Sequence, residues 1–98
     1  MSFIADFTEE ALGDLADLWT YYARVFDEKL AQRRVDEVLV RVQEICTFPE
    51  SGALHRGRKP DVRKISVRQY LIFYRASQGR VLILRVLNAR RGDLELEV

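Results

Sequence analysis

Arginine side chains, the residues of this chain best suited to charge-dependent chemistry, gather in its last third. Six fall in or just after segments with the composition of β-strands: Arg63, Arg68, Arg75, Arg85, Arg90 and Arg91. A guanidinium is not a base at neutral pH, but its planar fork pairs with phosphate or carboxylate and stabilises charge that develops on phosphorus. The cluster therefore suits RNA binding or cleavage, or the docking of an acidic protein. The alternative is pairing with nearby acids: Asp61, Asp93, Glu95 and Glu97.

Other kinds of catalytic site are missing from the sequence. It contains no Gly-rich phosphate loop, no Cys/His metal set and no dinucleotide fingerprint, so we expect no metal and no cofactor. Cys46, the single cysteine, falls on the apolar stripe of a predicted helix, where a small buried hydrophobe is expected. His55, the single histidine, lies in a predicted loop with nothing to tie it to that thiol. Four acids near the N-terminus have the spacing of a solvated helix face: Glu9, Glu10, Asp14 and Asp17.

The charge of the chain is unevenly distributed along its 98 residues. Residues 1–54 contain 5 Lys and Arg against 11 Asp and Glu, a net charge of −6, whereas residues 55–98 contain 11 against 4, a net charge of +7. Such a split is typical of a face that binds a polyanion or a protein partner, although each part could also only solvate itself. The length predicts a single domain over residues 1–98. With one cysteine and no run of apolar residues long enough to cross a membrane, we expect a cytoplasmic protein.

Two helices and several strands must position the arginines. Thr8 predicts the cap of a first helix and Asp27 the cap of a second, which Pro49 and Gly52 end. Apolar residues recur at helical spacing in both, first at Leu12, Leu15, Ala16, Trp19, Tyr22, Ala23 and Phe26, then at Ala31, Val35, Val38, Leu39, Val42, Ile45 and Cys46. Strands are predicted at 3–7, 62–68, 70–76 and 81–87. The expected fold is α+β, with an N-terminal strand and a helical hairpin packed on one face of a small, mainly antiparallel twisted sheet.

The last predicted strand is apolar on both faces. Strict alternation places Leu82, Leu84 and Val86 on one face, and on the other Val81, Ile83, Arg85 and Leu87. Two helices can cover only one face of the sheet. We therefore expect the C-terminal tail or another chain to cover the second face, since it would otherwise be an exposed apolar patch.

The order of elements and three local motifs resemble the RelE/ParE toxin superfamily, the ParE branch in particular. Residues 62–75, VRKISVRQYLIFYR, and 81–91, VLILRVLNARR, are similar to the arginine-rich hairpin and ending of that family, and 11–23, ALGDLADLWTYYA, to its first helix. The resemblance covers nearly the whole chain. It implies the toxin of a type II toxin–antitoxin system.

The resemblance leaves two activities open. RelE-type members cleave messenger RNA on the ribosome, and their catalytic positions correspond here to Lys59, Arg68 and Arg85. The residues after Leu87 include neither the tyrosine nor the histidine that usually completes that set. ParE-type members are associated instead with inhibition of DNA gyrase by protein binding. We expect a non-enzymatic ParE-like toxin, with a RelE-like endoribonuclease as the alternative and a non-toxic binding domain of the same fold as a third class.

The ParE resemblance also implies two binding surfaces. Three arginines are expected to face the target: Arg85, Arg90 and Arg91. A ParD-like antitoxin is expected to cover, with an acidic and apolar tail, the open face around Val81, Ile83, Arg85 and Leu87. Nucleic acid would then be contacted only indirectly, through the target or the antitoxin complex. Asn88 stands where histidine is common in the ParE branch, so no role is assigned to it.

Overall fold

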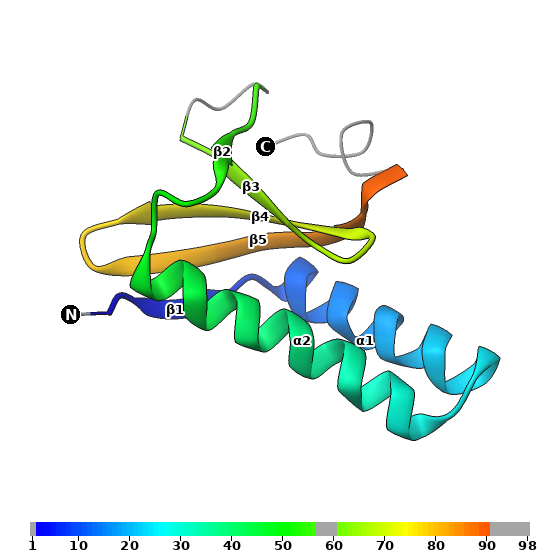
Figure 1. Cartoon of the computed structure of the whole chain (residues 1–98). Helices are drawn as coiled ribbons and strands as arrows, with labels where there is room; N and C mark the ends of the chain where they lie inside the picture. Colours follow the sequence, from blue (N-terminus) through cyan, green and yellow to red (C-terminus); the bar gives the residue numbers. More distant parts are fainter. Residues whose placement is uncertain (1, 57–60, 91–98) are drawn as a thin grey trace.

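The computed structural model describes residues 2–56 and 61–90, in which two helices pack on one face of a five-stranded sheet (Figure 1). The elements are, in chain order, β1 (Ile4–Phe7), α1 (Glu9–Val25), α2 (Glu28–Thr47), β2 (Ala53–Leu54), β3 (Arg63–Val67), β4 (Tyr70–Ser77) and β5 (Arg80–Asn88). The strands lie side by side in the order β1-β5-β4-β3-β2. β1 runs parallel to β5, and every other neighbouring pair is antiparallel. The predicted α+β class and its mainly antiparallel sheet are confirmed.

Both helices begin at the caps that the sequence predicts. Thr8 Oγ1 accepts a hydrogen bond from the Ala11 amide at 3.0 Å, and Asp27 Oδ1 accepts one from the Leu30 amide at 2.8 Å. These bonds satisfy amides that the first turn of a helix leaves without an intrahelical partner. Phe26 lies between the end of α1 and the Asp27 cap of α2, so the helices form a tight hairpin. Neither helix is long and apolar enough to cross a membrane, within the part of the chain that the structure describes.

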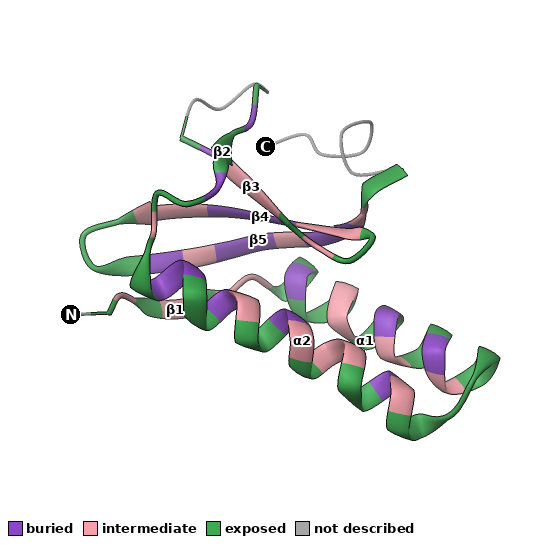
Figure 2. Ribbon diagram, in the orientation of Figure 1, coloured by how far each residue is buried: buried purple, intermediate pink, exposed green. Residues whose placement is uncertain are grey.

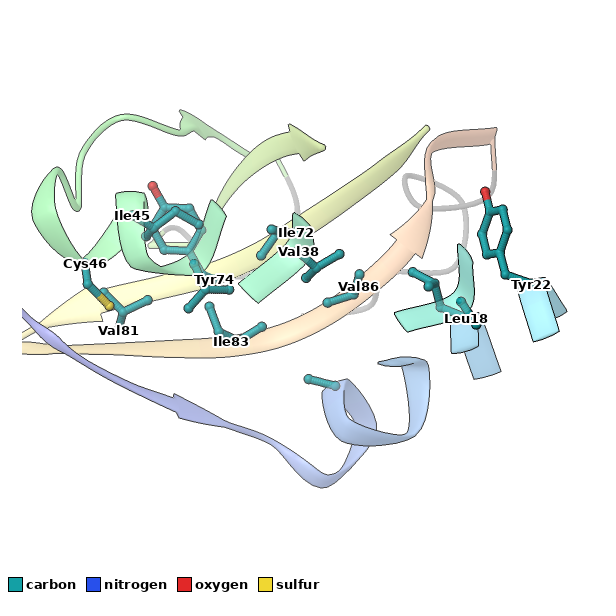
Figure 3. Close-up of a cluster of buried hydrophobic side chains, with 13 residues drawn as sticks. Leu18, Tyr22, Val38, Ile45, Cys46, Ile72, Tyr74, Val81, Ile83 and Val86 are labelled. Carbon is teal, nitrogen blue, oxygen red and sulfur yellow. The ribbon is translucent and has the colours of Figure 1, made fainter. Parts of the chain in front are cut away.

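The main core lies between the helical hairpin and the sheet (Figure 3). Val38 and Ile45 of α2 meet Ile72 and Tyr74 of β4 and Ile83 of β5, and none of these five is more than 1% exposed. Burying a side chain of this size stabilises a fold by roughly 1.5–3 kcal/mol relative to leaving it exposed. Burial is accordingly concentrated in β4 and β5, whereas each helix has buried and exposed stripes (Figure 2).

α1 turns a different stripe toward the core than the sequence predicted. Its fully buried positions are Ala11, Leu18 and Tyr22. Leu12, which was expected inside, is 54% exposed, and Phe26, just past the helix end, is 60% exposed. The predicted stripe was therefore wrong at both of its ends. α1 has more large apolar side chains than its contact with α2 and the sheet can bury.

The opposite face of the sheet carries a smaller apolar cluster made of Val62, Phe73, Leu84 and Leu87. His55 packs against it, with its ring edge-on to Phe73 at 5.2 Å between centroids, and is only 8% exposed. His55 lies in a loop, as predicted, but its ring is buried against the sheet. Cys46, in contrast, belongs to the main core under the helices. The thiol and the imidazole lie in different clusters, so they form no catalytic pair.

Candidate functional site

A groove between α1 and the end of β5 brings together two of the predicted target-facing arginines. Its main part has a volume of about 410 Å3, and an adjoining hollow of about 470 Å3 shares Tyr21, Gln69 and Asn88 with it. Arg85 lines the main part and Arg90 lines the hollow. We call the combined surface the α1/β5 groove. Its other lining residues are Asp14, Asp17, Leu18, Tyr70, Val86, Leu87 and Ala89.

The groove exists because β5 is longer than the strand beside it. β1 ends at Phe7, which pairs with Ile83, whereas β5 continues to Asn88. The chain turns away at Thr8 to begin α1, and the Thr8 hydroxyl donates to the Leu84 carbonyl at 2.8 Å. Beyond that point no described strand pairs with this edge of β5. α1 side chains therefore form the facing wall.

A β-bulge decides which β5 side chains face the helices. Tyr74 pairs with Ile83 and Phe73 pairs with Arg85, so Leu84 is an extra residue in β5. One extra residue exchanges the faces of every later position in a strand. Val81, Ile83 and Val86 accordingly lie in the main core, whereas Leu84 and Leu87 lie in the cluster on the other face.

The predicted common face of Val81, Ile83, Arg85 and Leu87 was therefore wrong. Val81 and Ile83 are fully buried against the helices and offer no surface to another chain. Leu87 is 8% exposed and lines the α1/β5 groove. Of the four residues, only Arg85 and Leu87 border a surface that a partner can reach.

Arg85 is held at the groove by a carboxylate of α1. Its Nε donates to Asp14 Oδ2 at 2.8 Å and its Nη2 donates to Oδ1 at 2.9 Å. The same Asp14 Oδ2 accepts the backbone amide of Val86 at 2.9 Å. Only 10% of the Asp14 side chain and 29% of the Arg85 side chain are exposed. This role of Asp14 was not predicted, because the acids of the first helix have the spacing of a solvated face.

Arg90 and Asn88 form the outer end of the groove. Asn88 Oδ1 accepts the backbone amide of Arg90 at 3.0 Å, which fixes the turn after β5. The Arg90 side chain is exposed. Arg91, the third predicted target-facing arginine, lies outside the described residues. Tyr21 of α1 is 52% exposed and lines the hollow with Arg90. It was missed as a site residue: its spacing puts it off the predicted apolar stripe, but nothing in the sequence shows that the end of β5 lies beside it.

Arg68 is held by the second helix. It occupies the β3–β4 turn at a φ of 53° and forms two hydrogen bonds of 2.8 Å with the Glu37 carboxylate. The pKa of Glu37 is lowered, chiefly by the hydrogen bond from Arg68; burial opposes this effect, and Arg34 adds to the lowering. The same pair raises the pKa of Arg68. Lys59, the remaining position of the predicted nuclease set, lies outside the described residues.

Two of the predicted arginines thus find their partners on the helices. Asp14 of α1 holds Arg85 and Glu37 of α2 holds Arg68, where the sequence suggested acids close to the strands. Asp93, Glu95 and Glu97 lie outside the described residues. In the ranges 2–56 and 61–90, no three His, Cys, Asp or Glu side chains are grouped closely enough to hold a metal ion. The α1/β5 groove combines cations, amides and an aromatic ring with an apolar floor.

A helical hairpin on one face of such a sheet defines a small α+β fold, and chains of two solved toxin–antitoxin structures share it. The fold is similar to a chain of the chromosomal ParDE toxin–antitoxin system of P. aeruginosa, with a TM-score of 0.76 at 19% identity over 89% of this chain and 96% of that chain. It is also similar to a chain of the RelBE2 toxin–antitoxin complex of Mycobacterium tuberculosis, with a TM-score of 0.65 at 19% identity over 90% and 99% of the two chains.

The sequence places the chain more narrowly. The sequence model of the ParE toxin of the type II toxin–antitoxin system, parDE, matches residues 5–92. The chain therefore belongs to the ParE toxin family, and the resemblance to that branch is confirmed. No curated protein sequence matches it.

Proposed function

We propose that this ParE-family toxin inhibits DNA gyrase through protein contacts and is neutralised by a ParD-like antitoxin. The observation that carries the proposal is the state of Arg68 and Arg85. Both are candidate nuclease residues, and each guanidinium is bound side-on by a helix carboxylate.

The paired arginines favour docking over RNA cleavage. A guanidinium that stabilises a transition-state phosphate must have its donors aimed at that phosphate. Here Glu37 and Asp14 occupy two donors of Arg68 and Arg85 respectively, and breaking either pair to admit a phosphate would cost the energy of a charge-assisted bond. A docking surface requires no such exchange.

The α1/β5 groove has the composition of a protein-binding site. Tyrosine and arginine dominate the energetic centres of protein interfaces, and here exposed Tyr21 lies beside Arg90 at one end of the groove. Leu18 and Val86, which belong to the main core, add an apolar floor. We assign the gyrase contact to this groove, with Arg90 as its principal cation.

Two assays run in parallel test the proposed target. Purified chain is added to a gyrase supercoiling reaction and to programmed ribosomes carrying messenger RNA. Lost supercoiling with intact RNA supports the proposal, whereas cut RNA with normal supercoiling refutes it and returns the RelE-like alternative. Arg90→Ala should weaken gyrase inhibition by at least about tenfold. Arg80→Ala is the matched control, because Arg80 makes only an exposed pair with Asp6 at 3.0 Å, outside the groove.

The antitoxin is proposed to cover the same groove, so that neutralisation is simple occlusion. The predicted site is thereby moved from Val81 and Ile83 to the groove bordered by Arg85 and Leu87. The isolated chain should bind a dye specific for exposed apolar surface, and the antitoxin should suppress that signal. A chain that binds no dye, or an antitoxin complex that still inhibits gyrase, would contradict occlusion.

A further inference from the structure

A second pocket lies at the C-terminal end of β4, which extends past the first residue of the neighbouring strand β3. β3 begins at Arg63, which pairs with Tyr74, so Arg75, Ala76 and Ser77 continue without a strand beside them on that edge in the part of the chain that the structure describes. The space next to this edge forms a pocket of about 530 Å3. Its walls also include Phe3, Pro49, Glu50, Leu54, Asp61 and Arg63. None of these residues lines the α1/β5 groove.

Arg75 is the unusual member of this pocket. Its Nε is buried, and no described residue gives the Arg75 side chain a hydrogen bond or an ion pair. Buried donors are nearly always paired in folded proteins, and a guanidinium without partners is more costly than a neutral donor. An arginine that the described residues leave unsatisfied is therefore suited to an acceptor that they do not supply.

The second arginine of the pocket is already engaged. Arg63 Nη1 donates to the Gly52 carbonyl at 2.8 Å and to the Glu50 carbonyl at 3.4 Å. Arg75 is thus the cation available to a ligand. Apolar side chains flank it, among them Leu54 of β2, which is 57% exposed.

The charges around the pocket limit the kind of ligand. Glu50 and Asp61 are exposed carboxylates of the lining, and they would repel a doubly charged group such as phosphate more strongly than a single carboxylate. One carboxylate matches the fork of one arginine. Because the wall of the pocket is apolar, a well-matched ligand carries apolar groups next to its carboxylate. A glutamate between two leucines has this composition.

We propose that this pocket binds a glutamate or aspartate side chain of an extended acidic and apolar segment of the antitoxin, with the carboxylate on Arg75. The open edge of β4 fits a segment in extended form, because such a chain can lie along a strand edge and place alternate side chains into a pocket. An acidic segment also complements residues 55–98, whose net charge is +7. The identity of the partner rests on the proposed function, whereas the binding chemistry of the pocket does not.

The test follows the Nε–Hε signal of Arg75 by nuclear magnetic resonance in the isolated chain. The probes are the peptide acetyl-Leu-Glu-Leu-amide, its matched neutral form acetyl-Leu-Gln-Leu-amide, and inorganic phosphate. We expect the Glu peptide to shift the Arg75 signal saturably and to bind at least about tenfold more tightly than the Gln peptide or phosphate. Binding to the variants is followed by the backbone amide signals of Ala76 and Ser77, which also line the pocket, because Arg75→Ala and Arg75→Lys lack the Nε–Hε group. Binding should be lost in Arg75→Ala and weakened in Arg75→Lys, which keeps the charge without the fork, and should be unchanged in Arg80→Ala.

Three results would overturn the proposal. These are no shift with the Glu peptide at millimolar concentration, equal binding of the two peptides, and tighter binding of phosphate. The remaining alternative is that Asp61 is the partner of Arg75 in solution. It predicts that Asp61→Asn shifts the Arg75 signal of the peptide-free chain and that no peptide binds, and this result would also overturn the proposal. Because the chain is used alone, a failure here is distinct from a failure of the gyrase or antitoxin assays.

Discussion

Asp14 and Arg85, 71 positions apart, join α1 to the open edge of β5 through one carboxylate. Asp14 accepts hydrogen bonds from Nε and Nη2 of Arg85, and it also accepts the Val86 amide, with which no described strand pairs. The interaction thus replaces a missing strand for part of the edge. It also keeps a positive charge at the groove without leaving that charge unpaired.

Replacing Asp14 by Asn should weaken the fold measurably. The amide keeps one acceptor for the Val86 backbone but loses the charge that holds Arg85. Since the pair is only partly exposed, we expect the free energy of unfolding to fall by about 1–2 kcal/mol. Urea unfolding should show a lower midpoint with an unchanged slope. Asp6→Asn, which breaks an exposed pair with Arg80, should cost less than about 0.5 kcal/mol. Equal costs for the two variants would contradict a special role for Asp14.

The Glu37 carboxylate should make stability depend on pH in the acid range. Its pKa in the folded chain lies below the ordinary value of 4.5, chiefly because Arg68 donates to it. A lowered pKa stabilises the fold fully above the unfolded value, and the contribution is lost as pH falls through the folded value. The difference in unfolding free energy between the native chain and Glu37→Gln should therefore be constant near neutral pH and shrink below about 4.5.

Urea unfolding from about pH 7 down to pH 3 measures this difference. Glu44→Gln is the control, since Glu44 lies 3.5 Å from Arg41 and its side chain is 57% exposed. The control should show a weaker dependence on pH. A stability difference for Glu37→Gln that grew on acidification would have the wrong sign.

Two glycines should respond to alanine in opposite directions. A Cβ on Gly52 would stand 2.7 Å from the Tyr74 hydroxyl and 2.9 Å from the Lys64 carbonyl. It would also disturb the hydrogen bond of 2.9 Å from the Gly52 amide to that hydroxyl. Gly52→Ala should therefore destabilise the chain by about 1–3 kcal/mol. Gly13→Ala, within α1 and with nothing within 4 Å of the new methyl group, should stabilise it by about 0.5–1 kcal/mol. Thermal unfolding of both variants decides the signs, and a stabilised Gly52→Ala would show that the loop moves aside.

Cys46 should be unreactive in the folded chain. Burial raises the pKa of its thiol, and the residue is 7% exposed in the main core. Because the thiolate is the reactive form, a disulfide reagent at neutral pH should label Cys46 only when the chain opens. The labelling rate should then rise with urea in step with unfolding, and the fully unfolded chain should react at once. Rapid labelling of the native chain would show that α2 does not protect this position.

Local patterns of the sequence were sufficient to predict both helices, their N-caps and the longer strands. Thr8 and Asp27 were correctly predicted as helix caps, because a cap contacts an amide only three residues further along the chain, so the residue types at those positions predict it. The fold class was also predictable, since apolar periods of helix and strand type follow one another with few alternatives for packing. β2 was missed, because two residues are too short to show a period.

Only the tertiary structure decided how the arginines are used. The bulge at Leu84 leaves no mark in the local sequence, yet it exchanged the faces of the later β5 residues and made the predicted common face of Val81, Ile83, Arg85 and Leu87 wrong. The pairs that hold Arg68 and Arg85 join residues 31 and 71 positions apart, and such distances carry no local signal. The sequence by itself determined which side chains are present and which elements carry them. Folding determined which charges neutralise one another and which remain available, because that depends on where the packed helices bring their carboxylates.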